Sequence, residues 1–179
     1  MKELSKELIF EVEDGLAIIT LNRPEKSNAL TTSMCEHLRE ILEQVKRRDE
    51  IKVLVITGSD PAFCAGSDIE TRLLPRIVDE RYVPLEKTRA NLLEPVMLYL
   101  APAIYDLGKP SIAGINGVAA GGGLSIALLC DIRIASEKAR LGAPWINIGL
   151  TPDCGATFLL PRIIRSRQSL KAILHRRVY

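Results

Sequence analysis

Short apolar runs separated by polar turns open the chain. Residues 8–12 and 16–21 have the composition of β-strands, and they flank Asp14-Gly15, a dipeptide that favours the positive φ of a tight hairpin turn. Apolar residues then recur at helical spacing, behind a threonine N-cap at Thr31 or Thr32 and ahead of a basic run that suits a helix C-terminus. The pattern predicts a β-hairpin followed by a helix that packs by one face.

Later apolar segments are continuous rather than alternating. Residues 53–57, 111–115 and 132–135 have the pattern of buried strands, and residues 124–129 that of a strongly apolar helix. The stretch 68–105 mixes charges with helical periodicity and is interrupted by prolines, which break helices. This order of elements predicts an α/β chain with repeated ββα units.

Composition limits the partners that the chain is expected to have. Its 179 residues fit one domain, residues 1–179, with a sizeable core, and a net charge of +2 lacks the basic field typical of nucleic-acid binding. The four cysteines are scattered, without the spacing of a disulfide framework or a metal site, and predict a reducing, cytoplasmic setting. No apolar run suits a membrane span or an export signal.

Two glycine-bearing turns follow buried strands, at residues 63–68 and 116–123. Each could project a backbone N–H past the carboxyl edge of the sheet, and the second lies at the start of a helix whose dipole favours negative charge. The alternative is that the glycines only permit sharp turns and close packing. Together, the two turns could form an oxyanion hole.

Three segments, residues 22–30, 62–69 and 116–131, resemble in this order the motifs of the crotonase superfamily, also called the enoyl-CoA hydratase/isomerase family. The resemblance extends from about Leu8 onward. It implies a crotonase-like spiral of repeated ββα units that forms a homo-oligomer, a trimer or a hexamer. Family members normally continue into a C-terminal helical region, which this chain lacks.

By this resemblance, the N–H groups of Ala65 and Gly122 bind the carbonyl oxygen of an acyl-CoA thioester, and coenzyme A enters only as part of the substrate. No separate cofactor or metal is implied. Lys26 would meet a CoA phosphate, with a solvated surface lysine as the alternative, and Asp68 could instead cap the following helix. The resemblance assigns substrate binding to Lys26, Ala29, Leu30, Gly66, Ser67, Asp68, Ile69 and Gly121.

Two carboxylates of the family's hydratases are missing from this chain. Those enzymes use two glutamates to ionise a water, and the corresponding residues here are Ser125 and Trp145. A serine has little base strength near neutral pH and an indole N–H only donates, so hydration is disfavoured. Ser125 is interpreted as a small helix residue, and Trp145 as an apolar, substrate-binding wall for the acyl chain.

Asp153 is the one carboxylate at a family position, where several enoyl-CoA isomerases carry an acid that moves a proton. One base suffices to shift a double bond while the oxyanion hole holds the dienolate. Burial against Trp145, Leu150 and Phe158 is expected to raise the pKa of Asp153. The alternative is an N-cap of the following helix.

The leading hypothesis is therefore an enoyl-CoA isomerase of fatty-acid or aromatic-acid metabolism. A catalytically silent CoA-binding or oligomer-forming paralogue is the rival, and a hydratase-type lyase working through Glu70 or Asp131 is a third possibility. A tryptophan eight residues before an aspartate also resembles 4-chlorobenzoyl-CoA dehalogenase. That mechanism needs a histidine, and neither His37 nor His175 matches.

Overall fold

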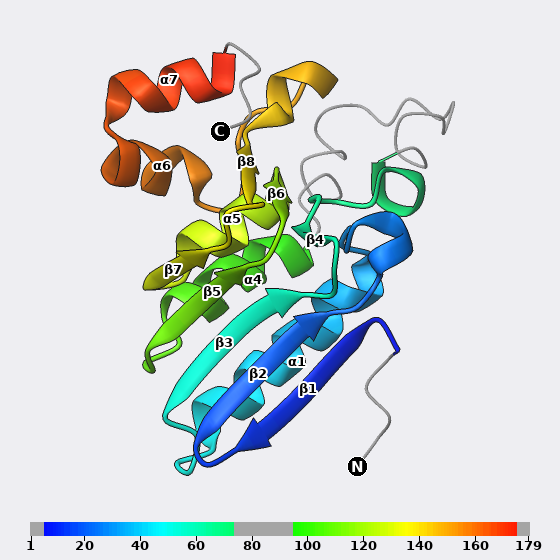
Figure 1. Cartoon of the computed structure of the whole chain (residues 1–179), viewed down its shortest axis with the longest axis vertical. Helices are drawn as coiled ribbons and strands as arrows, with labels where there is room; N and C mark the ends of the chain where they lie inside the picture. The colour runs from blue at the N-terminus through cyan, green and yellow to red at the C-terminus, as the bar shows by residue number, and fades with distance from the viewer. Residues whose placement is uncertain (1–5, 74–94, 175–179) are drawn as a thin grey trace.

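The computed structural model describes residues 6–73 and 95–174. Its larger sheet has five strands in the order β1-β2-β3-β5-β7, of which β1 and β2 form an antiparallel hairpin and the others run parallel (Figure 1). The hairpin turn has positive φ at Asp14 and Gly15, as predicted. The strands are β1 (Leu8–Glu13), β2 (Leu16–Leu21), β3 (Val53–Gly58), β5 (Ser111–Ile115) and β7 (Ile132–Ala135).

A second, smaller sheet lies beyond the carboxyl ends of the first (Figure 1). It has three short parallel strands in the order β4-β6-β8: β4 (Ala62–Cys64), β6 (Val118–Ala120) and β8 (Arg140–Gly142). The chain passes from the larger sheet to the smaller one after β3, after β5 and after β7. Each passage builds one ββ unit, and a helix follows, so the predicted ββα repeat is confirmed.

Five helices and three short helical turns complete the described part of the chain. Helix α1 begins after Thr31, whose hydroxyl oxygen accepts the Met34 N–H at 3.0 Å, so Thr31 and not Thr32 is the N-cap. The helices are α1 (Thr32–Arg47), α4 (Pro95–Tyr105), α5 (Gly122–Leu129), α6 (Ala156–Ile164) and α7 (Ser166–Leu174), and the turns are Pro24–Lys26, Ile69–Leu73 and Pro144–Ile148.

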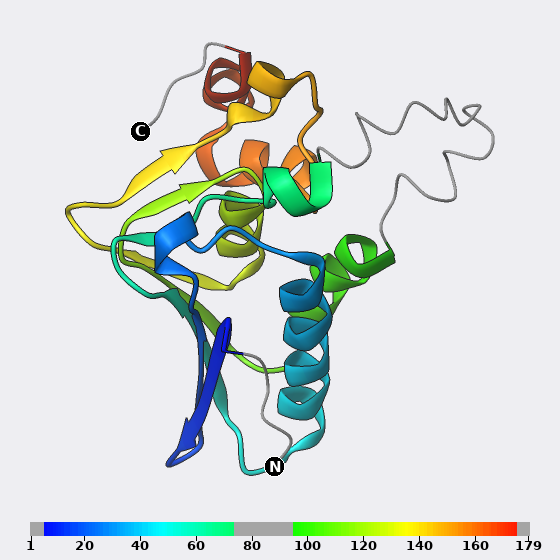
Figure 2. The ribbon, with the colours of Figure 1, turned by 90° about the vertical axis from the view of Figure 1, so that its right-hand side faces the viewer.

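Helices α1 and α4 lie side by side along one face of the larger sheet (Figure 2). The apolar stripe of α1 is buried there and contributes six residues to the main core: Met34, Cys35, Leu38, Ile41, Leu42 and Val45. The proline-interrupted stretch predicted between residues 68 and 105 appears as the turn Ile69–Leu73 and as α4, and its middle lies outside the described residues. No helix of the described residues is long and apolar enough to cross a membrane.

Helix α5 is buried on all sides and packs directly on β4. A β-carbon at Gly123 would lie 2.2 Å from the Cys64 carbonyl oxygen, so only glycine allows this approach. The contact brings the start of α5 against the segment that follows β4. The alternative role predicted for the glycines, close packing, is therefore present at Gly123.

We expect Gly123→Ala to lower the free energy of unfolding by roughly 1–3 kcal/mol, because the added methyl group forces two main-chain segments apart. Gly114→Ala in β5 is the matched control, since its β-carbon would meet nothing closer than 3.5 Å. Urea unfolding of both variants measures the difference. Equal losses in the two variants would contradict this explanation.

Candidate active site

The two glycine-bearing turns meet at the N-terminus of α5. Gly66 has a φ of +102°, and a β-carbon there would lie 2.9 Å from the Ala120 carbonyl oxygen and 3.2 Å from the Gly122 nitrogen. Gly121, the N-cap of α5, has a φ of 51° and a ψ of −124°, a conformation that favours glycine. The segment after β4 and the first turn of α5 are therefore in main-chain contact, as the sequence predicted.

Gly122 is the first residue of α5, so its N–H has no acceptor within the helix. The aligned peptide dipoles of α5 give this end of the helix a partial positive charge, which favours an anion or a developing oxyanion. The helix has eight residues, and its first turn is held by the Ser125 N–H, which donates to the Gly121 carbonyl oxygen at 3.0 Å. Gly122 is therefore oriented by a fixed backbone.

The prediction that Ala65 supplies the second amide is wrong. The Ala65 N–H donates to the Ser27 carbonyl oxygen at 2.9 Å, because residues 65–68 pair with residues 27–30 as a short parallel ladder. In this ladder the Leu30 N–H donates to Gly66 O at 2.7 Å, and the Asp68 N–H donates to Leu30 O at 2.9 Å. The ladder holds the Ala65 amide on the side of residues 27–30.

Ser67 is the residue bridged to Leu30 in this ladder. The Gly66 carbonyl oxygen accepts the Leu30 N–H, and the Ser67 N–H lies on the opposite side of the same trans peptide unit, so the Ser67 amide points away from Leu30. The Gly66 N–H before it approaches Cys64 Sγ at 3.4 Å, and burial raises the pKa of that thiol to about 12, so the sulfur is neutral. Sequence reasoning assigned Ser67 to substrate binding but not to the second amide position, because the hydrogen bonds between residues 27–30 and 65–68 leave no periodic signal in the sequence.

Asp68 is a buried structural carboxylate, 4% exposed. One oxygen accepts the Thr71 N–H at 2.9 Å and the other lies 2.8 Å from Arg23 Nη1. The predicted alternative, a cap on the following turn, is therefore confirmed, and both carboxylate oxygens have partners within the protein. Desolvation opposes the charge, but the hydrogen bonds from Thr71 and Arg23 outweigh it and hold the pKa of Asp68 below its usual range.

The other residues assigned to substrate binding differ in exposure. Lys26 and Ile69 are exposed, and Lys26 Nζ lies 3.0 Å from Glu70 Oε2 on the neighbouring turn. Ala29 and Ser67 are half-buried, whereas the Leu30 side chain is fully buried in the main core and only its main chain faces the ladder.

Asp153 lies against the first turn of α5. Ser125, fully buried in that turn, donates its hydroxyl proton to Gly121 O or Asp153 O, at 3.3 and 3.2 Å. The Trp145 indole N–H donates to Asp153 Oδ1 at 3.1 Å. Ser125 and Trp145 occupy the positions of the two hydratase glutamates, and each donates a hydrogen bond to Asp153. The sequence did not predict this link.

Three expectations about this region are wrong. Asp153 is exposed, and so are Leu150 and Phe158, at 42% and 50%, so the predicted burial is absent. Helix α6 begins after Gly155, which adopts the left-handed conformation, and Asp153 does not cap it by its side chain. Trp145 is 3% exposed and packs with α5, α6 and α7 in a second core, so its ring is not an open wall for an acyl chain.

No metal-binding cluster occurs among residues 6–73 and 95–174, since no three His, Cys, Asp or Glu side chains converge there. An apolar cavity of about 510 Å³ lies between α5, α6 and α7. Its lining extends from Leu124, in the first turn of α5, to Leu128 and to Ile164 at the end of α6. Gly66, Gly122 and Asp153 are not part of this lining.

The sequence profile of the enoyl-CoA hydratase/isomerase family matches residues 11–178. The chain belongs to this family. The enoyl-CoA hydratase structure from Bacillus anthracis superposes with a TM-score of 0.83 at 30% identity, covering 96% of this chain and 64% of that one. The architecture of two sheets joined by ββα units is accordingly the crotonase fold.

Family relatives carry the names of different reactions. The 1,2-epoxyphenylacetyl-CoA isomerase of Escherichia coli (strain K12) is 38% identical over 165 residues, 87% of this chain and 57% of the relative. The short-chain-enoyl-CoA hydratase of Clostridium acetobutylicum is 35% identical over 162 residues, again 57% of the relative. The chain thus spans little more than half the length of the curated relatives it matches.

Asp68 gives the first test of the site. Its pKa lies below the value of about 3.9 for an unfolded chain, so its stabilising charge is fully present above that pH and is lost as the pH falls through the folded-state pKa. We expect the difference in free energy of unfolding between wild type and Asp68→Asn to be large at pH 7 and to narrow below about pH 4. Urea unfolding across this pH range measures it.

The exposed carboxylate of Glu137 supplies the control for this experiment. Glu137→Gln should leave stability close to wild type throughout the same pH range. A difference for Asp68→Asn that stays constant from pH 7 to pH 3 would exclude a stabilising charge on Asp68.

Proposed function

We propose that the chain binds an enoyl-CoA thioester and moves its double bond between the 3,4 and 2,3 positions. The main-chain amides of Gly122 and Ser67 hold the thioester oxygen, and Asp153 moves the proton. The position of Asp153 supports the proposal most directly, because Ser125 in the first turn of α5 binds its main-chain carbonyl and so keeps the residue near the helix end that carries the Gly122 amide. Asp153 is exposed and can therefore reach a bound substrate.

The reaction needs one base and one anion site. The Asp153 carboxylate removes a proton from Cα of a 3-enoyl thioester, and the electron pair spreads over the dienolate to the thioester oxygen. Amide N–H groups stabilise that oxygen, and Asp153 then returns the proton to Cγ. The Trp145 indole fixes the direction of one Asp153 oxygen and leaves the other for the proton.

Ser125 and Trp145 weigh against hydration as the specific reaction. Ser125 Oγ lies within hydrogen-bonding distance of Gly121 O and Asp153 O in a fully buried position, so it has no route to a water and no base strength. Trp145 is likewise buried and only donates. An isomerase mechanism with a single carboxylate fits both residues.

Lys26 is proposed to meet a phosphate of the CoA moiety. It is exposed, and its ammonium group lies 3.0 Å from Glu70 Oε2, which is also on an exposed side chain. Exposed ion pairs contribute little to stability, so a phosphate can displace Glu70 at small cost. The lysine acts here as a point charge rather than as a directional donor.

A homo-oligomer, a trimer or a hexamer, is part of the proposal. Phe158 and Ile163 on α6 and Leu170 and Leu174 on α7 are between 41% and 57% exposed. Apolar groups gathered on neighbouring helices commonly mark a contact between subunits. Phe158 is also covered on one side by the Arg162 guanidinium, 3.5 Å from its ring centre.

We expect Asp153→Asn to lower the turnover of a 3-enoyl-CoA by roughly 10²–10⁴-fold, because the variant keeps the size of the side chain and loses its basicity. Acyl-CoA affinity, measured by calorimetry, should change little. Asp106→Asn, an exposed substitution at the end of α4, is the matched control and should keep wild-type turnover. Equal turnover of Asp153→Asn and wild type would exclude this base.

The same assay separates the rival function. A wild-type chain that binds an acyl-CoA without turning over 3-enoyl or 2-enoyl thioesters would be a silent CoA-binding paralogue. A chain that binds no acyl-CoA would contradict the substrate class itself.

We expect Gly66→Ala to lower turnover by roughly 10²–10³-fold, the loss typical of one oxyanion donor. The new β-carbon would lie 3.2 Å from the Gly122 nitrogen and 2.9 Å from Ala120 O, so the two turns must separate. Gly108→Ala is the control, because Gly108 also has positive φ, +75°, but open space around it. Similar turnover of the two variants would show that backbone strain, and not the contact with Gly122, accounts for any loss.

A further inference from the structure

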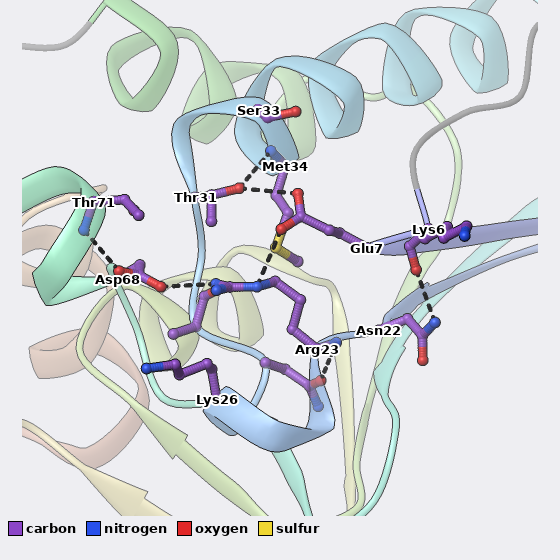
Figure 3. Close-up of polar contacts among 12 residues, drawn as sticks. Lys6, Glu7, Asn22, Arg23, Lys26, Thr31, Ser33, Met34, Asp68 and Thr71 are labelled. Atoms are coloured by element: carbon purple, nitrogen blue, oxygen red, sulfur yellow. Dashed lines mark hydrogen bonds and ion pairs between the residues drawn. The ribbon is translucent and has the colours of Figure 1, made fainter.

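A buried guanidinium lies beside the candidate site without belonging to its proposed chemistry. Arg23 is 13% exposed in its side chain, and Figure 3 shows it at the centre of a polar cluster. Its Nε lies 3.1 Å from Glu7 Oε1, and its Nη1 lies 2.8 Å from Asp68 Oδ2. The same Nη1 donates to the Ala29 carbonyl oxygen at 2.7 Å. One side chain thus joins three segments that are far apart in sequence.

These contacts span the short ladder that sets the direction of the Ser67 amide. Ala29 belongs to the segment of residues 27–30, and Asp68 ends the opposite segment of residues 65–68. Arg23 Nη1 donates to both segments at once, to the main chain of one and to the carboxylate of the other. The guanidinium therefore holds the two segments of the ladder together from the side.

Both ends of the cluster are anchored on helical elements (Figure 3). Glu7 Oε2 accepts the Thr31 hydroxyl at 3.2 Å, and Thr31 in turn caps α1 through the Met34 N–H. At the other end, Asp68 Oδ1 accepts the Thr71 N–H. The position of Arg23 is thereby tied to the start of α1 and to the turn Ile69–Leu73.

The loop that carries Arg23 is fixed by a second set of bonds. The Arg23 N–H donates to Asn28 Oδ1 at 2.8 Å, and the Asn28 N–H donates back to the Arg23 carbonyl oxygen at 2.8 Å. Asn28 is fully buried and donates its side-chain amide to Ser59 O at 2.7 Å and to Ala62 O at 2.6 Å. The main chain of Arg23 is therefore as constrained as its side chain.

We propose that Arg23 is a positioning residue for the thioester site: by clamping residues 29 and 68 together, it aims the Ser67 amide at the oxygen that the Gly122 amide also binds. This inference rests on the proposed function. The Ser67 N–H shares a peptide unit with the Gly66 carbonyl, which accepts the Leu30 N–H. The Leu30 N–H in turn shares a peptide unit with the Ala29 carbonyl that Arg23 binds, so a movement of this unit turns the one that carries the Ser67 N–H. A displacement of about 1 Å in such a group is enough to lower a rate by roughly 10²-fold.

The absorption band of a bound thioester shows whether the Ser67 and Gly122 N–H groups point at its carbonyl oxygen. A dimethylaminocinnamoyl thioester of CoA absorbs at longer wavelength when its carbonyl oxygen accepts strong hydrogen bonds, so the shift of its band at saturation measures the amides directly. Binding of the CoA portion is measured separately by calorimetry with CoA. A residue needed only for folding would change the fraction of competent protein and not the band position of the bound probe.

We expect Arg23→Met to lose at least half of the band shift at saturation, and to lower the kcat for a 3-enoyl-CoA by roughly 10²-fold, with the affinity for CoA within a few-fold of wild type. Arg23→Lys should recover little, because an ammonium cannot reproduce the planar fork that reaches Glu7, Ala29 and Asp68 together. Arg47→Met, which removes an arginine from an exposed ion pair with Glu43, is the control and should keep the full shift.

A double variant distinguishes aiming from charge compensation. Arg23→Met alone leaves the buried Asp68 charge unpaired, which destabilises the fold, whereas Arg23→Met with Asp68→Asn removes both charges. The proposal requires the double variant to be folded and still deficient in the band shift. A stable double variant with the full band shift would overturn the proposed role of Arg23. If Arg23→Met alone does not fold, the double variant decides the question.

The outcomes also separate this inference from the function on which it rests. A wild-type chain that does not bind the probe, or binds it with no change of its band, contradicts the proposed thioester site. A wild-type chain that shifts the band, together with an Arg23→Met variant that shifts it equally, contradicts only the role of Arg23.

Discussion

Direct contact between main-chain segments is the constraint on which the candidate site depends. Helix α5 approaches β4 so closely that a β-carbon at Gly123 would lie 2.2 Å from Cys64 O, and the turn at Gly66 approaches Gly122 with similar restriction. Side chains cannot enter either contact. The geometry of the site is therefore set by backbone packing, which varies little when surface side chains change.

The ββα repeat brings the other participants to this contact. Its first unit ends in the segment that pairs with residues 27–30, its second supplies α5, and its third leads through β8 and the turn Pro144–Ile148 to Asp153. Ser125 then joins the second unit to the third by its hydrogen bond to the Asp153 carbonyl, and Trp145 binds the Asp153 carboxylate within the third unit. Consecutive repeats thus each contribute one part, and the smaller sheet sets their spacing.

Sequence patterns predicted the strongly periodic parts of this fold and missed the irregular ones. The hairpin, α1 and the apolar strands β3, β5 and β7 follow from alternation, helical spacing and continuous apolar runs, and the contact of the two glycine turns follows from their places after β3 and β5. The strands β4, β6 and β8 have only three residues each and carry no periodic signal. The register between residues 27–30 and 65–68 was equally hidden, and this hid the bonded state of Ala65. The exposure of Asp153 was missed because burial depends on which residues surround it in space.

Because the proposed anion site is made of peptide groups, it does not depend on which side chain transfers the proton. Substitutions at a position such as Asp153 can therefore change the reaction while the grip on the thioester persists. A lineage can change its reaction while every intermediate sequence still binds the thioester. Gene duplication acting on such a scaffold would yield many reactions from one architecture, each step requiring few changes.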